Sequence, residues 1–219
     1  MKNLFFVISI MFSTSIYAQT YTTEDKVLTG VFDTQGKTKA QIYSAINKWI
    51  SINYNSGKSV TQLSDVDAGN IVVKGINEVS YPNISKIIYP NMKSISDLAT
   101  MKFNHLIEIN IRDNKFRIIY KIVDFHIDPA MAGYMTPEMI KMSNDVINLN
   151  GISDAALLAT SEFMDMSFKK SMIGKDKRDL VKESIKPTYD ELNRNLIANM
   201  KSTMLSILSA VTVPTSDSW

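Results

Sequence analysis

The chain contains no cysteine and only two histidines among its 219 residues. The absence of cysteine excludes disulfides, iron–sulfur clusters and thiol catalysis. Without disulfides, a fold that works in an oxidising compartment must be held together by its core alone. Long hydrophobic runs are also missing, since no segment after the first residues approaches the roughly 20 apolar residues of a membrane-spanning helix. We therefore expect no transmembrane segment in the mature chain.

Neither sign of charge dominates, because the formal net charge is +2. So weak a field does not steer a protein toward nucleic acid or anionic lipid, and we expect no nucleic-acid partner. Two common hydrolase motifs, G-x-S-x-G and H-E-x-x-H, are absent as well. Hydrophobic residues make up 45% of the chain and charged residues 21%, which is ordinary for a globular protein. The composition predicts a globular fold with no recognisable catalytic residues and no cofactor.

Residues 1–18 have the three parts of a cleavable signal peptide. Lys2 supplies the positive start, and Leu4–Phe12 form an apolar core. Ser15 and Ala18 then give the small residues of an A-x-A-like cleavage site. The same features leave open an uncleaved N-terminal anchor. The sequence predicts export to the periplasm or the outside of the cell, with cleavage after Ala18.

Residues 19–130 are predicted to form an α+β domain, in which a twisted antiparallel sheet of about five strands carries a packed helix. The helix is expected from Lys39 to Tyr54. Thr38 and Gln41 have capping-box spacing just before it, and apolar residues then recur at intervals of three and four.

The strands before residue 100 are expected at 27–33, 60–64 and 70–80. Residues 19–26 are polar and are interpreted as a loose lead-in. Residues 81–100 contain two prolines, which do not fit a central strand. This segment is interpreted as a loop or insertion.

Two alternating segments, 101–112 and 115–122, predict a β-hairpin. Their apolar residues fall at odd positions in the first segment and at even positions in the second. A two-residue turn at Asp113-Asn114 pairs Arg112 with Lys115 and brings both apolar sets to one face. Asp and Asn tolerate the positive φ that such tight turns require.

The opposite face of this hairpin is predicted to be both basic and apolar. Its charged residues are Lys102, Arg112, Lys115, Arg117 and Lys121, and its apolar residues are Leu106, Ile119, Val123 and Phe125. Such a face suits an anionic glycan, a peptide or another protein. The more conservative interpretation is a solvated face, or one covered by the C-terminal helices. The candidate ligand or partner surface comprises Lys102, Arg112, Lys115, Arg117, Ile119 and Lys121.

Residues 131–219 are predicted to form a helical extension, packed on or beside the α+β domain. Helices are expected to begin at Pro137 and at Ser153. A longer one contains an apolar stripe from Tyr189 to Val211 at intervals of three and four. Pro187 is expected to start or kink this last helix.

Three stretches of the sequence carry a resemblance to a known family: KAQIYSAINKWISINYNS at 39–56, D-x-x-x-G-x-I-x-x-K-G at 65–75 and FNHLIEINIRDNKFRIIYKIVDF at 103–125. They resemble an uncharacterised family of exported bacterial domains with a TATA-binding-protein-like (TBP-like) fold. The predicted order of strand, helix, four strands and closing helix is similar to that of a TBP-like half-fold. The segment 83–100 and the final hundred residues depart from the pattern. The resemblance implies a fold and export but no activity, and DNA binding does not follow from a fold.

The histidines, His105 and His126, are weak candidates for catalysis. On the predicted register they share a face but lie about 13 Å apart along the strands, too far to bind one metal ion. His105 lies in an apolar row and is interpreted as a hydrogen-bonded core residue. His126, near Asp124 and Asp128, could form a base with an orienting carboxylate, although no nucleophile is visible beside it. A Ser-His-Asp triad stays open, because triads are recognised by geometry.

Two further patterns suggest metal ions, and both have simpler interpretations. Asp65–Asn70 resembles a calcium loop, but an Asp- and Gly-containing turn between two strands explains it better. Thioethers suit Cu(I), and the methionines in question are Met131, Met135, Met139 and Met142. Methionine at helical spacing is ordinarily core packing. We expect no metal site.

These observations favour an exported, non-catalytic binding or assembly module of the cell envelope, whose partner is an envelope protein or a glycan. One alternative is an enzyme with a dispersed active site near His126. Another is a structural subunit that forms homo-oligomers through the C-terminal helices. An uncovered apolar stripe on residues 189–211 would favour the latter.

Overall fold

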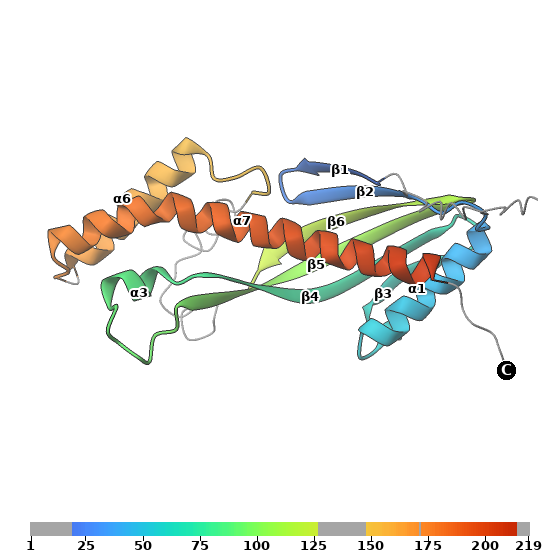
Figure 1. The fold of residues 1–219 in the computed structure, drawn as a ribbon, viewed down its shortest axis with the longest axis horizontal. Helices are drawn as coiled ribbons and strands as arrows, with labels where there is room; N and C mark the ends of the chain where they lie inside the picture. Colours follow the sequence, from blue (N-terminus) through green and yellow to red (C-terminus); the bar gives the residue numbers. More distant parts are fainter. Residues whose placement is uncertain (1–18, 127–147, 171, 214–219) are drawn as a thin grey trace, which may run out of the picture.

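The computed structural model describes residues 19–126, 148–170 and 172–213. Within them, six strands form one antiparallel sheet in the order β1-β2-β6-β5-β4-β3 (Figure 1). The strands are β1 (Gln19–Glu24), β2 (Val27–Asp33), β3 (Thr61–Asp65), β4 (Asn70–Pro82), β5 (Leu98–Arg112) and β6 (Lys115–Phe125). The helices are α1 (Lys39–Asn53), α2 (Gly57–Val60), α3 (Ile84–Ile88), α6 (Asp154–Lys170) and α7 (Lys175–Thr212). The predicted α+β class is confirmed.

Helix α1 begins where the capping box predicts. The Thr38 hydroxyl accepts a hydrogen bond from the Gln41 backbone N–H at 3.3 Å, and the Gln41 side chain accepts one from the Thr38 N–H at 2.9 Å. Both bonds satisfy donors that the first helical turn leaves unpaired. The apolar face of the helix is buried at Ile42, Ile46, Trp49 and Ile50.

The β5–β6 hairpin has the predicted register near its turn. Arg112 pairs with Lys115, and the pairing continues without a shift as far as His105 with Ile122. Asn114 adopts the positive φ that the tight turn requires, at 64°.

A β-bulge at Val123 ends this register. Beyond it Asn104 pairs with Asp124, and Phe103 pairs with Phe125. An extra residue in one strand reverses the faces of all residues after it. Phe125 is therefore buried in the core, and the prediction that it lies on the outer face was wrong.

Two segments interpreted as irregular contain regular structure. Residues 19–24 form β1, an edge strand paired with β2. Because its side chains are mostly exposed, this strand does not need alternating apolar residues, which are the pattern that predicts a strand. In the segment 81–100, β4 continues to Pro82, α3 follows, and β5 starts at Leu98. Pro82 is tolerated because β3 pairs with β4 only from Asn70 to Val73, which leaves the distal part of β4 at an edge.

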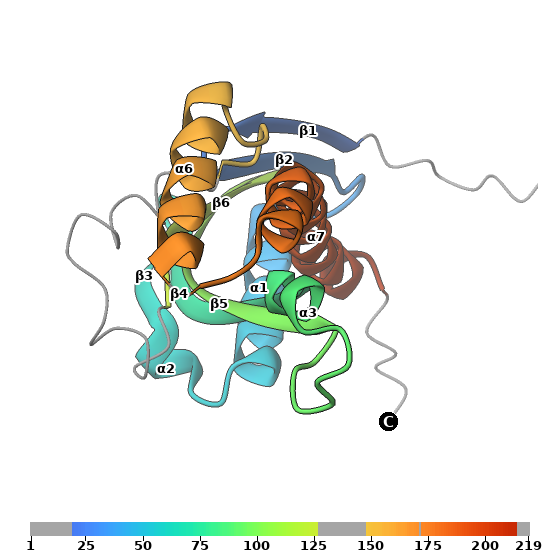
Figure 2. The same ribbon diagram turned by 90° about the vertical axis from the view of Figure 1, so that its left-hand side faces the viewer.

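Helices α1 and α7 pack on the same face of the sheet. Figure 2 shows both inside its curve, and their buried side chains join those of the strands in one core. The stripe on α7 comprises Leu192, Leu196, Met200, Met204, Ile207 and Val211, all buried. Because the sheet covers this stripe within one chain, it offers no free apolar surface for the homo-oligomer considered above.

Helix α7 is longer than predicted, because it starts at Lys175 and passes through Pro187 as one element. Val181 and Ile185 are fully buried and continue the stripe toward the N-terminus at helical spacing. Their burial explains why the helix does not begin at the proline.

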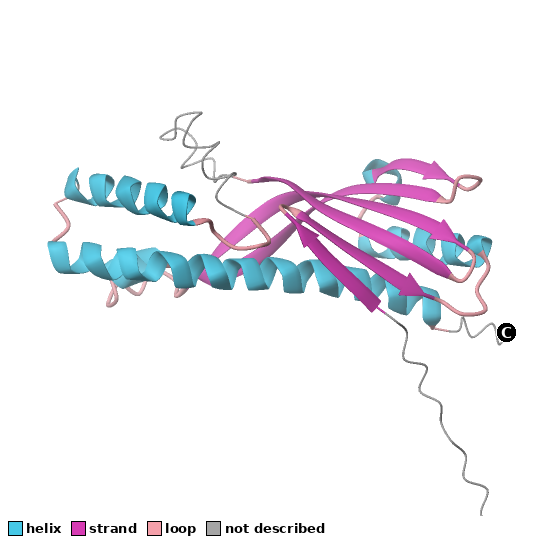
Figure 3. Cartoon of the chain, turned by 90° about the horizontal axis from the view of Figure 1, so that it is seen from above, coloured by secondary structure: helices cyan, strands magenta, loops and turns pink. Residues whose placement is uncertain are grey.

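Helix α6 starts after Ser153 as predicted, and the Ser153 hydroxyl accepts a hydrogen bond from the Ala156 N–H at 3.2 Å. The helix runs alongside the N-terminal half of α7 (Figure 3). Asp165 of α6 joins the two helices through Lys182 at 3.2 Å and Arg178 at 3.5 Å, both on α7. It also pairs with Lys169 of its own helix at 2.7 Å. None of the helices in the described part of the chain is long and apolar enough to cross a membrane.

Replacement of Gly75 by alanine is expected to lower the free energy of unfolding by about 1–3 kcal/mol through overpacking. A Cβ at this position would lie 2.7 Å from His105 Nε2 and 2.9 Å from Tyr54 Cε1, so the buried His105 ring and the half-buried Tyr54 ring would have to move. Gly57→Ala is the control, because its Cβ would meet nothing nearer than 3.5 Å. Denaturant titration of both variants checks the prediction, and equal midpoints would contradict it.

Candidate functional site

The face of the sheet opposite α1 and α7, here called the outer face, displays the predicted basic residues. Arg112, Lys115, Arg117 and Lys121 are exposed, and they alternate with buried residues on the core side of β5 and β6. Ile119 is half-buried between them. The alternation predicted from the sequence thus places these residues on one surface.

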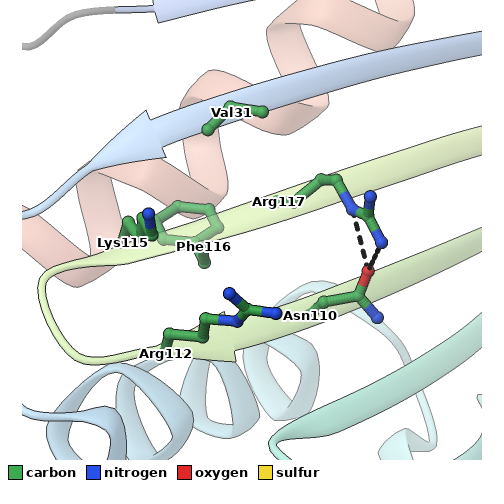
Figure 4. A pocket seen from close by; sticks show the side chains of 6 residues that line it. All are labelled: Val31, Asn110, Arg112, Lys115, Phe116 and Arg117. Atoms are coloured by element: carbon green, nitrogen blue, oxygen red, sulfur yellow. Dashed lines mark hydrogen bonds between the residues drawn. The ribbon is translucent and has the colours of Figure 1, made fainter.

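A pocket of about 230 Å³ opens on the outer face at the hairpin end. Val31, Asn110, Arg112, Lys115, Phe116 and Arg117 line it, and we call it the hairpin pocket (Figure 4). The strand register explains why these residues meet. Arg117 of β6 lies directly between Val31 of β2 and Asn110 of β5.

Asn110 holds the Arg117 guanidinium in place. The Arg117 Nε and Nη2 groups both donate to Asn110 Oδ1, at 3.0 and 2.6 Å (Figure 4). The Asn110 amide in turn donates to Glu108 Oε1 at 2.9 Å and to Asn70 Oδ1 at 3.1 Å. This network fixes one edge of the guanidinium and leaves its Nη1 group for another acceptor.

A wider hollow of about 450 Å³ shares Asn110, Arg112 and Arg117 with the hairpin pocket. It also includes Lys39 at the start of α1 and Asp113 of the turn. The Asp113 carboxylate accepts a hydrogen bond from the Lys39 backbone N–H at 2.6 Å. This carboxylate therefore caps the N-terminus of α1.

The charge of the hairpin pocket is not neutralised within the described residues. No carboxylate there comes within ion-pair distance of Arg112, Lys115, Arg117 or Lys121. Asp33 is the cross-strand neighbour of Lys115, but it forms no ion pair with it. Several cations without carboxylate partners around one concave surface attract an anionic group.

The six predicted surface residues do not form a single site. Arg112, Lys115 and Arg117 gather in the hairpin pocket, and Ile119 and Lys121 follow along β6.

Lys102 lies ten residues from Arg112 on β5, a separation of about 34 Å along a strand. It faces Glu78 at 3.9 Å, and both side chains are largely exposed. Such a surface ion pair contributes little to stability, and Lys102 is not part of the pocket.

His105 is a hydrogen-bonded core residue, as predicted. It is 3% exposed, and its Nε2 lies 3.2 Å from the Tyr54 hydroxyl. Burial lowers the pKa of His105 to about 4, and it raises the pKa of Tyr54 to about 12.

His126 lies on the opposite face from His105, so the prediction of a shared face was wrong. The bulge at Val123 is the cause. His126 is exposed, and its Nε2 lies 3.0 Å from Asn104 Oδ1, while Asn104 donates to Asp124 at 2.6 Å. Asp124 therefore reaches the histidine through an amide rather than directly. The other predicted partner, Asp128, lies outside the described residues.

Asp65–Asn70 is a turn between β3 and β4, as the simpler interpretation held. Asp65 Oδ1 accepts a hydrogen bond from the Ala68 N–H at 2.8 Å, and Gly69 has a φ of +71°. The methionines considered for copper, Met131 to Met142, lie outside the described residues.

The surface predicted from the sequence did not include Val31, Asn110 or Lys39. Val31 and Lys39 depend on contacts between distant segments, since β2 pairs with β6 and the start of α1 approaches the hairpin turn. Asn110 lies opposite Arg117 within the hairpin itself. The alternation within β2 was a usable signal for Val31, because it separates exposed from buried positions. The alternation does not predict which strand pairs with β2.

The sheet with its two helices on one face defines a TBP-like α+β domain. Residues 29–127 match the model of a family described as a domain of unknown function (DUF4468) with TBP-like fold. The resemblance inferred from the residues is thereby confirmed.

Two solved structures are similar to the chain. A TBP-like protein from Parabacteroides distasonis ATCC 8503 is 16% identical, with a TM-score of 0.51 over 85% of this chain and 92% of that one. A DUF4468 family protein from Bacteroides ovatus ATCC 8483 is 13% identical, with a TM-score of 0.49 over 87% of this chain and 88% of that one. No curated protein matches the sequence. At 16% identity, the likeness to the Parabacteroides distasonis protein shows the fold alone.

Proposed function

We propose that this chain is an exported, non-catalytic binding or assembly module of the bacterial cell envelope. The observation that supports it best is the hairpin pocket, where cations without carboxylate partners surround a concave surface on the outer face. The signal-peptide pattern of residues 1–18 supports export. The binding surface in this proposal comprises the hairpin pocket together with Ile119 and Lys121.

Recovery of partners from an envelope extract of the source organism tests this proposal. The bait is the chain from residue 19 to 219, beside a variant carrying Arg117→Glu and Lys121→Glu. Reversal of two charges on the outer face is expected to abolish retention of a specific partner, because like charges then face each other. Mass spectrometry of the retained proteins gives the readout.

A matched control reverses two exposed charges elsewhere, at Lys48 on α1 and at Lys93 before β5. It changes the net charge equally and is expected to keep the partner. Loss of the partner in both variants, or its retention in both, would contradict a binding surface on the hairpin. If no variant and no wild-type bait retained any protein or glycan, the binding module itself would be wrong. Circular dichroism confirms that each variant is folded.

A further inference from the structure

An aliphatic patch adjoins the hairpin pocket on the outer face. Its members are side chains of four neighbouring strands in the centre of the sheet: Val31, Val72, Leu106 and Ile119. The register places Val72, Glu108 and Ile119 in one cross-strand row, and Lys74, Leu106 and Lys121 in the next. Val31 is 38% exposed, and the other three are half-buried. The patch is thus accessible and lies between cations.

The composition of this face distinguishes between classes of anionic ligand. Sugar rings pack well on the faces of aromatic side chains, but no described side chain that points outward from β2, β4, β5 or β6 is aromatic. Phe116 lines the hairpin pocket, but its side chain is on the core side and is 1% exposed. Aliphatic groups beside cations instead match a partner that alternates aliphatic side chains with carboxylates. The face therefore favours a protein segment over an acidic glycan.

The spacing along β6 matches an extended chain. Lys115, Arg117, Ile119 and Lys121 are successive outer residues of this strand, so neighbours lie about 7 Å apart. Alternate side chains of an extended peptide have the same spacing. A peptide lying along β6 can therefore place one side chain on each of these positions.

We propose that the outer face of the β5–β6 hairpin binds an extended acidic segment of a partner protein. Its carboxylates contact Lys115, Arg117 and Lys121, and an aliphatic side chain between them packs on Ile119. This assignment rests on the proposed function as a binding module, for which it names the class of partner.

Two features of the site make the recognition selective. The Nη1 group of Arg117, held in place by the bonds from Nε and Nη2 to Asn110, presents donors to a carboxylate with little further ordering. Glu108 lies directly opposite Ile119 in the register, so it repels a carboxylate at that point of the ligand. The aliphatic side chain of the segment is thereby directed to Ile119.

Fluorescence anisotropy with a labelled peptide of alternating glutamate and valine tests the assignment. The chain from residue 19 to 219 is expected to bind it, and Arg117→Gln/Lys121→Gln to bind about tenfold more weakly, as expected for two exposed ion pairs. The control Lys48→Gln/Lys93→Gln is expected to bind like the wild type. Binding should also weaken with added salt, because the charges are exposed.

Two further probes decide the class of partner. A glutamine–valine peptide is expected not to bind, and equal binding of both peptides would overturn the role of the carboxylates. Oligogalacturonate tests the glycan: if it bound through Arg117 and Lys121 while the acidic peptide did not, the partner would be a glycan. Suppose the envelope extract yields a partner that depends on these charges, yet the acidic peptide does not bind. That result would contradict an acidic peptide segment as the partner but would still support the proposed function as a binding module. If neither experiment showed binding, both proposals would be wrong.

Discussion

Replacement of Leu196 by alanine is expected to lower the free energy of unfolding by about 2–5 kcal/mol. Leu196 is fully buried in the stripe of α7 that packs on the sheet. The truncation removes apolar contact and leaves a cavity that the surrounding side chains fill only in part. Denaturant unfolding, followed through the buried Trp49 and through circular dichroism, measures the change.

The control is a leucine on the same helix, since Leu205 is 42% exposed. Leu205→Ala is expected to change the free energy of unfolding by about 1 kcal/mol or less. Equal losses in the two variants would contradict the packing of α7 on the sheet. A single transition for both probes would further indicate that sheet and helix unfold as one unit, which bears on the predicted division of the chain near residue 130.

Acidification from about pH 7.5 to about pH 4.5 is expected to cost up to about 3 kcal/mol of stability through His105 alone. Burial lowers the pKa of this histidine from 6.5 to about 4 in the folded chain. Between these values the unfolded chain binds more protons than the folded one. The contribution of the neutral, buried ring is therefore complete above about pH 6.5 and is lost as the pH falls toward 4.

Carboxylates also titrate in this range, so the test compares two proteins that differ at His105 alone. In a His126→Gln background, His105 is the remaining histidine of the chain. Adding His105→Gln is expected to remove the part of the pH dependence between about pH 4.5 and 6.5 that the histidine causes. Equal slopes of unfolding free energy against pH in the two proteins would contradict the assignment.

The hairpin shows how far local patterning can predict a fold. The alternation on both sides of Asp113 and Asn114 admits one register that buries both apolar sets, and the structure has that register as far as His105 and Ile122. The bulge at Val123 could not be predicted, because one inserted residue leaves the alternation before it unchanged. Its effect falls on Phe125 and His126, the two residues assigned to the wrong face.

Two further elements, the edge strand β1 and the start of α7, could not be predicted from local sequence patterns. Strand β1 pairs through its backbone and exposes most of its side chains, so its residues carry no burial pattern to recognise. The start of α7 was missed because Pro187 is a stronger local signal than the spacing of Val181 and Ile185.

For the candidate site, the sequence predicted which residues of β5 and β6 lie on the outer face. It did not predict that some of them line one pocket together. The hairpin pocket needs Val31 of β2 beside Arg117 of β6, a pairing between segments more than eighty residues apart in the sequence. Similarly, the network from Arg117 through Asn110 to Glu108 depends on the geometry of neighbouring side chains. Alternation assigns these three residues to a face but does not say that they bond to one another.

The register of β1 and β2 against β6 also makes the hairpin pocket accessible to site-specific spectroscopy. Thr20 pairs with Val31, and Val31 pairs with Arg117, so an exposed side chain of the edge strand lies about 10 Å from β6. Because the chain has no cysteine, a Thr20→Cys substitution would supply a unique thiol for a fluorophore or a spin label. A reporter at that position lies beside the pocket without replacing any residue that lines it, and can register the arrival of a bound molecule in real time.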